Sequence, residues 1–80
     1  MNREEIVNKL QEIFRKVFKE PNLMIAEEMT AEDVEAWDSL SHVQMISETE
    51  KAFGIKFKIR EIRRLKNVGE FIELIDKKLN

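Results

Sequence analysis

One serine in this sequence stands where a side chain could carry chemistry. Ser39 lies in the segment Trp37-Asp38-Ser39-Leu40, where an aperiodic stretch gives way to a predicted helix. Asp38 and Ser39 are both residue types that favour the first position of a helix. A serine there is exposed at the positive end of the helix dipole, beside backbone N–H groups that favour a phosphate. Taken alone, Ser39 is more simply explained as an ordinary capping residue, since serine is favoured there.

A serine–histidine pair is the alternative chemistry, because His42 lies one helical turn after Ser39. Such a pair also needs an orienting carboxylate and an oxyanion site in a pocket, and an exposed helix surface offers neither. We therefore expect no catalytic residue and interpret His42 as a contact for a partner. The chain has no cysteine and one histidine. Thiolate and multi-histidine metal sites are thus excluded, no metal is expected, and any thiol must come from an added group.

Helical periodicity accounts for the first part of the chain. An apolar face at helical spacing predicts an amphipathic helix that ends close to Pro21. Its members are Ile6, Val7, Leu10, Ile13, Phe14, Val17 and Phe18. Residues 20–37 lack periodicity and are expected to form a long loop, in which Thr30 and Asp33 cap a short turn. Apolar anchors should pack that loop onto the helices: Leu23, Ile25, Met29, Val34 and Trp37.

Three further helices are predicted after the loop. The first runs from Asp38 to Gly54, a natural C-terminal stop, and a short segment follows with Ile59, Ile62 and Leu65 at one spacing. Asn67 should cap the last helix, with Glu70 as its partner. We place Val43, Ile46, Thr49, Glu50 and Phe53 on one face of the first of these helices, and Val68, Phe71, Ile72, Ile75 and Leu79 on the inner side of the last. No strand pattern competes with this all-α prediction.

The whole arrangement resembles the acyl carrier protein family. The resemblance rests on Asp38-Ser39-Leu40 at the start of a helix, on the Phe53-Gly54 stop about one helix later, and on the short and closing helices beyond. It covers nearly the entire chain. It implies a four-helix bundle with three main helices, a short third helix and a long loop between the first two.

The resemblance also implies a cofactor and a set of partners. In that family the serine of the Asp-Ser-Leu motif is esterified by 4′-phosphopantetheine from coenzyme A, so Ser39 is the expected attachment residue with Asp38 and Leu40 as motif neighbours. A Mg²⁺-dependent phosphopantetheinyl transferase would add the arm. Acyl-loading and acyl-transfer enzymes would then use its terminal thiol, while the carrier performs no chemistry itself.

Cargo and partner contacts are expected beside Ser39. Family members can shelter an acyl chain between helices, and Val43, Ile46, Ile62 and Leu65 would line such a cleft, although apolar stripes more often form plain core. Leu40, His42, Gln44, Ser47 and Glu48 are the candidate contacts for partner enzymes. Carriers of fatty-acid synthesis that resemble this chain typically have a strongly acidic second helix. Here the equivalent surface holds Ser41, His42, Gln44 and Ser47, with acids only at Glu48 and Glu50.

The short third segment is basic instead. Residues 55–80 carry eight bases and four acids in a chain whose net charge is −2. Since electrostatic matching selects partners, we expect a specialised carrier, in polyketide, lipid or cell-surface chemistry, more than a housekeeping one. An aminoacyl or peptidyl carrier and an unmodified helical interaction domain remain alternatives. Nucleic-acid binding is disfavoured, because a local basic stretch in an acidic chain is weak evidence for it.

Length and composition bound the rest. Residues 1–80 suit one domain with a modest core and no room for an enzyme-sized cleft. No apolar run approaches the roughly 20 residues that span a bilayer, and the first residues show helical spacing instead of the apolar centre of a signal peptide. We expect a cytoplasmic monomer.

Overall fold

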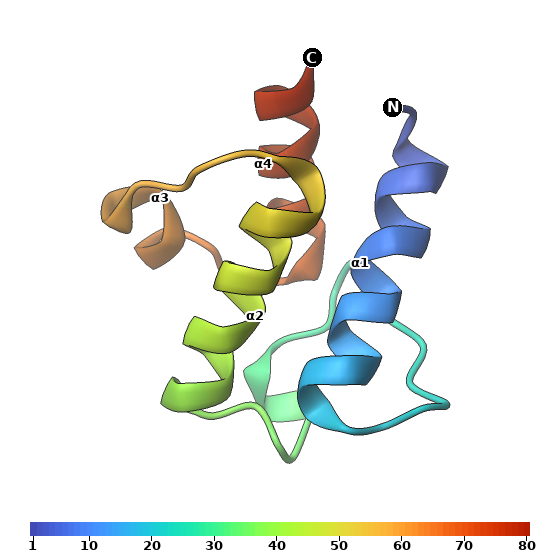
Figure 1. Cartoon of the computed structure of the whole chain (residues 1–80). Helices are drawn as coiled ribbons and strands as arrows, with labels where there is room; N and C mark the ends of the chain where they lie inside the picture. Colours follow the sequence, from blue (N-terminus) through green and yellow to red (C-terminus); the bar gives the residue numbers. More distant parts are fainter.

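The computed structural model describes residues 1–80 and contains only helices and loops (Figure 1). The order is α1 (Arg3–Phe18), a 3₁₀ turn η1 (Ala31–Asp33), α2 (Ser39–Phe53), α3 (Ile59–Arg63) and α4 (Val68–Leu79). Helix α1 packs against both α2 and α4, and the short α3 lies to one side of this bundle. The predicted all-α fold, with a short third helix and a long loop before α2, is confirmed. None of the helices combines the length and hydropathy needed to cross a bilayer.

Local signals place the helix ends. Asn2 caps α1, and Lys19 ends it in the left-handed conformation at φ 56°, just before Pro21. Gly54 ends α2 at φ 65°, where glycine is favoured because it has no Cβ. The side chain of Asn67 accepts the N–H of Glu70 at 2.9 Å, as expected. The Glu70 carboxylate accepts the N–H of Lys66 and not that of Asn67, so the reciprocal capping box predicted there does not form.

The long loop is fastened to the start of α4. The N–H of Val68 donates to the carbonyl of Met29 at 2.9 Å, and the N–H of Gly69 donates to the carbonyl of Glu27 at 2.8 Å. A Cβ on Gly69 would stand 3.0 Å from that Glu27 oxygen, so any larger residue would crowd this approach. The predicted turn at Thr30 and Asp33 is present, with each residue capping the other. The loop is therefore a packed part of the fold.

The core forms where the inner faces of α1, α2 and α4 meet. Its fully enclosed members include Ile6, Leu10, Phe14, Met45 and Ile75. Trp37 packs the loop onto this core, with its ring 5.3 Å from that of Phe14 and 5.4 Å from that of Phe18. The loop anchor predicted at Trp37 is thus confirmed.

Two predicted faces differ from the structure. Val43 is 64% exposed, whereas Ser41, Met45 and Thr49 are buried. The buried stripe of α2 repeats every four residues, and Val43 stands two residues from Ser41 and Met45, a spacing that puts side chains on opposite sides of a helix. In the third segment Ile59 is 71% exposed, and α3 ends at Arg63. Leu65 therefore lies in the link to α4 and not on the helix.

Candidate functional site

The start of α2 is built by a reciprocal pair of hydrogen bonds. The carboxylate of Asp38, the N-cap, accepts the N–H of Ser41 at 2.9 Å, and the hydroxyl of Ser41 accepts the N–H of Asp38 at 2.8 Å. The same hydroxyl donates to the carbonyl of Ala36 at 2.8 Å. Ser41 thereby ties the end of the loop to the first turn of the helix.

Ser39 is the first residue of α2, and its side chain is exposed. The hydrogen bonds that hold the turn use Asp38 and Ser41 and leave the Ser39 hydroxyl free. The neighbouring Leu40 is 69% exposed. The turn thus presents one unengaged hydroxyl beside one exposed apolar side chain.

The electrostatics at this turn are set by Asp38. The backbone N–H of Ser41 holds the pKa of the Asp38 carboxyl below its ordinary value, so the group stays ionised near neutral pH. Because Asp38 occupies the N–H of Ser41, a phosphate on Ser39 could use only the amides before it. The start of α2 therefore offers a phosphate fewer free backbone N–H groups than an uncapped helix would.

Ser41 was placed on the partner-facing surface by the sequence, and that placement is wrong. Its side chain is buried and makes the bonds described above. The signal that could have found it is the spacing Asp38-x-x-Ser41, which pairs an N-cap residue with a polar side chain three residues on.

The four acyl-pocket candidates fall into two adjoining places. Val43, Ile46 and Ile62 line a shallow groove between α2 and α3. Leu65 lines a separate cavity of about 120 Å³. His42 borders both the groove and the cavity. The four side chains therefore do not line one cleft. They line a groove and a cavity that meet at His42.

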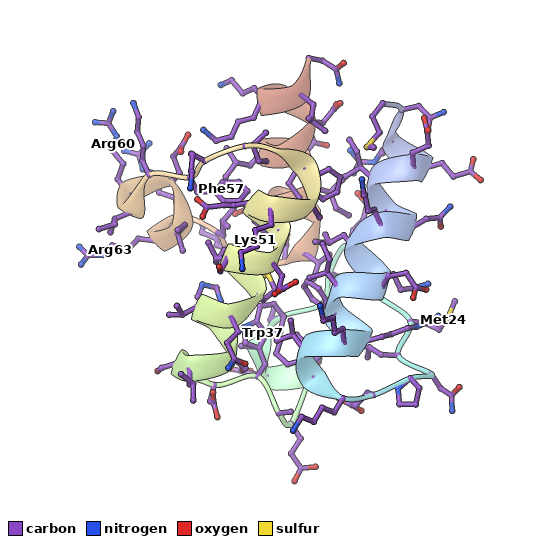
Figure 2. The ribbon with its side chains drawn as sticks, viewed as in Figure 1. Met24, Trp37, Lys51, Phe57, Arg60 and Arg63 are labelled. Atoms are coloured by element: carbon purple, nitrogen blue, oxygen red, sulfur yellow. The ribbon has the colours of Figure 1, made fainter.

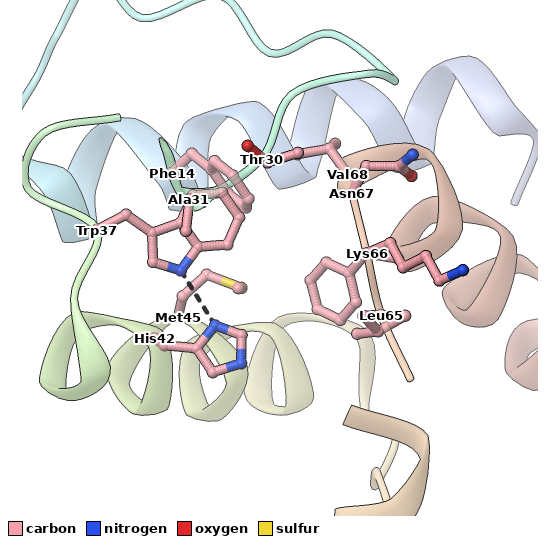
Figure 3. A pocket seen from close by; sticks show the side chains of 11 residues that line it. Phe14, Thr30, Ala31, Trp37, His42, Met45, Leu65, Lys66, Asn67 and Val68 are labelled. Carbon is pink, nitrogen blue, oxygen red and sulfur yellow. Dashed lines mark hydrogen bonds between the residues drawn. The ribbon is translucent and has the colours of Figure 1, made fainter. Parts of the chain in front are cut away.

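The cavity is walled largely by residues that sequence patterns had assigned only to packing. Figure 3 shows Trp37, His42 and Met45 on one side and Leu65 and Lys66 on the other. Phe14 and Phe71 complete its apolar lining. The ring N–H of Trp37 donates to Nδ1 of His42 at 3.0 Å, and the two ring planes lie within 18° of each other. No sequence pattern couples residues five apart, so this contact could not have been predicted.

The candidate contacts for partner enzymes differ in their exposure and in the bonds that they make within the fold. Leu40 and Gln44 are exposed, whereas His42, Ser47 and Glu48 are half-buried. Glu48 forms an ion pair with Lys16 of α1 at 3.3 Å, and His42 is held by Trp37. Gln44, Ser47 and Glu48 face a shallow depression between α1 and α2.

These features agree with what comparison with known proteins finds. A family model described as "Phosphopantetheine attachment site" matches residues 8–75. The acyl carrier protein of Thermosynechococcus vestitus is 32% identical over 80 residues, which cover 99% of this chain and 98% of that protein.

The chain belongs to the acyl carrier protein family. The acyl carrier protein of Rubrobacter xylanophilus is 36% identical over 76 residues, covering 94% of this chain and 93% of that protein. A solution NMR structure of holo acyl carrier protein from Geobacter metallireducens superimposes with a TM-score of 0.86 at 44% identity, covering 91% of this chain and 84% of that chain. The resemblance seen in the sequence is confirmed. The chain is an acyl carrier protein, a non-catalytic carrier with a phosphopantetheine attachment site.

The Trp37–His42 contact of this acyl carrier protein gives a pH-dependent prediction. Nδ1 of His42 accepts a hydrogen bond, so the ring is neutral in the fold, and burial lowers the pKa of His42 below its ordinary value of 6.5. The unfolded chain therefore binds the proton more readily. The free energy of unfolding should be highest above about pH 7 and fall as the pH drops through about 6.5.

Urea unfolding at about pH 7.5 and 5.5 measures this effect, with His42→Gln as the control because it keeps an acceptor but does not titrate. The native protein should lose more stability than the variant over that interval. Equal losses would show that His42 is not held neutral. The indole N–H resonance of Trp37 should shift in the same titration.

Proposed function

We propose that Ser39 is the residue that carries the phosphopantetheine arm of this acyl carrier protein. One observation carries the proposal: of the two hydroxyls at the start of α2, that of Ser39 is exposed and unbonded, whereas that of Ser41 is buried and engaged with Asp38 and Ala36. A transferase needs a hydroxyl that it can reach and deprotonate. Only Ser39 meets that requirement without opening the helix.

The chain's own part in the attachment is to present this hydroxyl. The bond that forms joins Oγ of Ser39 to the pantetheine-side phosphorus of coenzyme A. The bond that breaks is the P–O bond of its pyrophosphate, which releases adenosine 3′,5′-bisphosphate, and the serine proton goes to a base of the transferase. Asp38 holds the helix start in place and stays ionised there. Leu40, exposed beside Ser39, offers an apolar anchor to the transferase. When bound, the arm supplies the thiol that the chain lacks.

The groove beside Ser39 supports the proposal that the acyl chain can be sheltered against the protein there. Val43, one turn after Ser39, faces it together with Ile46 and Ile62. Beyond His42, the cavity that Leu65 lines has about 120 Å³, close to the roughly 150 Å³ that accommodates a benzene ring. A cavity of this size would shelter only the first few methylenes of an acyl chain.

We further propose that the carrier serves a specialised set of enzymes. Every acidic side chain between residues 38 and 54 is engaged within the fold. Asp38 caps α2, Glu48 pairs with Lys16, and the carboxylate of Glu50 accepts the N–H of Phe57 at 2.8 Å. The surface of α2 thus offers little free negative charge to a basic enzyme patch, and electrostatic matching is what steers such encounters.

The attachment is tested by incubating the unmodified protein with coenzyme A, Mg²⁺ and a broad-specificity phosphopantetheinyl transferase. Intact-mass analysis should show a gain of one arm in the native chain and none in Ser39→Ala. No gain in the native chain, or the same gain in the variant, would remove the proposal.

The specialised role is tested with an elongating enzyme of a fatty-acid system. We expect the holo protein to be a poor substrate, and the double variant Gln44→Glu with Ser47→Glu to be used better, because it adds negative charge to the surface of α2. Gln44→Ala with Ser47→Ala is the matched control. Native activity equal to that of a fatty-acid carrier protein would contradict this part of the proposal.

A further inference from the structure

The surface around α3 carries cations that the fold leaves unpaired. Six bases lie between residues 55 and 66, all exposed, and none of them forms an ion pair: Lys56, Lys58, Arg60, Arg63, Arg64 and Lys66. We call these six, with Ile59, the basic α3 surface. The one acid in this stretch, Glu61, is already paired with Lys78 of α4 at 3.0 Å. The charge is therefore available to a partner.

The scaffold that presents this charge is fixed to the bundle. The ring of Phe57 lies 5.4 Å from that of Phe71, and the Phe57 N–H donates to Glu50 of α2. The carboxylate of Glu61 also accepts the N–H of Lys58 at 2.8 Å. Figure 2 shows Phe57 turned toward the bundle and Arg60 and Arg63 directed away from it. A backbone held in this way needs little further ordering when the surface binds, so the entropy lost on binding is mainly that of the long basic side chains.

An apolar side chain lies among these charges. Ile59 is 71% exposed and is flanked in sequence by Lys58 and Arg60. Ile62, one turn later, faces the groove that α3 shares with Val43 of α2. A partner that covered the basic α3 surface would therefore also lie next to the groove that begins one turn from Ser39.

We propose that the basic α3 surface docks an acidic patch on a partner enzyme, with Ile59 as the apolar contact at its centre. This rests on the proposed function, since docking there would bring the partner to the arm on Ser39. An anionic membrane fits less well, because five-residue α3 exposes a single large apolar side chain and lacks the broad apolar face of a surface helix. Nucleic acid fits less well because the chain as a whole is acidic and the aromatic ring of this segment, Phe57, packs inward.

The test titrates the ¹⁵N-labelled holo protein with a synthetic peptide of glutamates around one leucine, with the leucine replaced by serine, and with a glutamine peptide. Amide shifts should cluster in residues 55–66, weaken with salt, be larger for the leucine peptide than for the serine one, and be absent with glutamine. Arg60→Glu, Arg63→Glu and Arg64→Glu together should weaken binding at least about tenfold. Lys9→Glu, Lys19→Glu and Lys77→Glu, with the same charge change elsewhere, should weaken it less.

The proposal is overturned if the peptide does not shift these residues, or if both triple variants weaken binding equally. It is also overturned if duplex DNA or vesicles containing an anionic phospholipid bind more tightly than the leucine peptide at physiological salt. Repeating the titration with the unmodified protein separates the two proposals. Failure of the transferase to modify Ser39 counts against the attachment, whereas normal modification without peptide binding counts against this surface alone.

Discussion

Replacing Ser41 by alanine should destabilise this carrier while leaving it a substrate for modification, and replacing Ser39 should do the reverse. Ser41→Ala leaves the N–H of Asp38 and the carbonyl of Ala36 without their buried partner, which costs about 1–3 kcal/mol of unfolding free energy. Ser39→Ala removes a hydroxyl that bonds to nothing and should change stability by no more than about 0.5 kcal/mol. Urea unfolding and intact-mass analysis after transferase treatment measure the two effects.

The pair of variants controls for itself, because the same chemical change is made two residues apart. If Ser41→Ala abolished modification while the protein remained folded, Ser41 would have a direct role in the attachment, contrary to its assignment as a purely structural residue. If Ser39→Ala were the destabilising change, the hydrogen bonds at the start of α2 would be assigned to the wrong serine.

The largest expected effect on stability comes from Phe14. Its ring is fully buried in α1, contacts Trp37 and Phe18, and forms part of the wall of the cavity that Leu65 also lines. Phe14→Ala should cost about 3–5 kcal/mol, which is comparable to the whole stability of many small domains. Thermal or urea unfolding followed by circular dichroism measures the loss.

Because Phe14→Ala could leave no folded protein, Phe14→Leu provides a graded test, with an expected cost of about 1–2 kcal/mol. Leu40→Ala is the control, since Leu40 is exposed and its truncation should cost no more than about 0.5 kcal/mol. Equal effects of the changes at positions 14 and 40 would contradict the packing described for the core.

The sequence was sufficient for much of the fold because its helix signals are local. The apolar stripe of α1, the Asn67 cap and the Gly54 stop each depend on residues within one or two turns. The inner face of α2 was less certain, since its apolar residues spread around more than one side. Val43 fits the periodicity as well as Met45 does, and only the positions of α1 and α4 decide which is buried.

The candidate site likewise has parts that a local motif predicts and parts that depend on contacts between distant segments. Ser39 follows from a short motif at a predictable helix start. The inward role of Ser41 depends on the carbonyl of Ala36 in the loop, and the cavity depends on Trp37, Phe14 and Leu65, which come from three separate parts of the chain. Contacts between distant segments leave no periodic trace in the sequence. For the same reason the sequence does not predict that Ile59 is exposed, because its exposure depends on how α3 lies against the rest of the bundle.

The most direct test of the central proposal is to locate the arm on the unaltered chain. Trypsin should release residues 20–51 as one peptide, and this peptide holds all three serines, Ser39, Ser41 and Ser47. After treatment with transferase and coenzyme A, fragment-ion mass spectrometry of this peptide assigns the modified residue. We expect one phosphopantetheine on Ser39 and none on the other two. An arm on Ser41 or Ser47, or an unmodified peptide, would contradict this assignment.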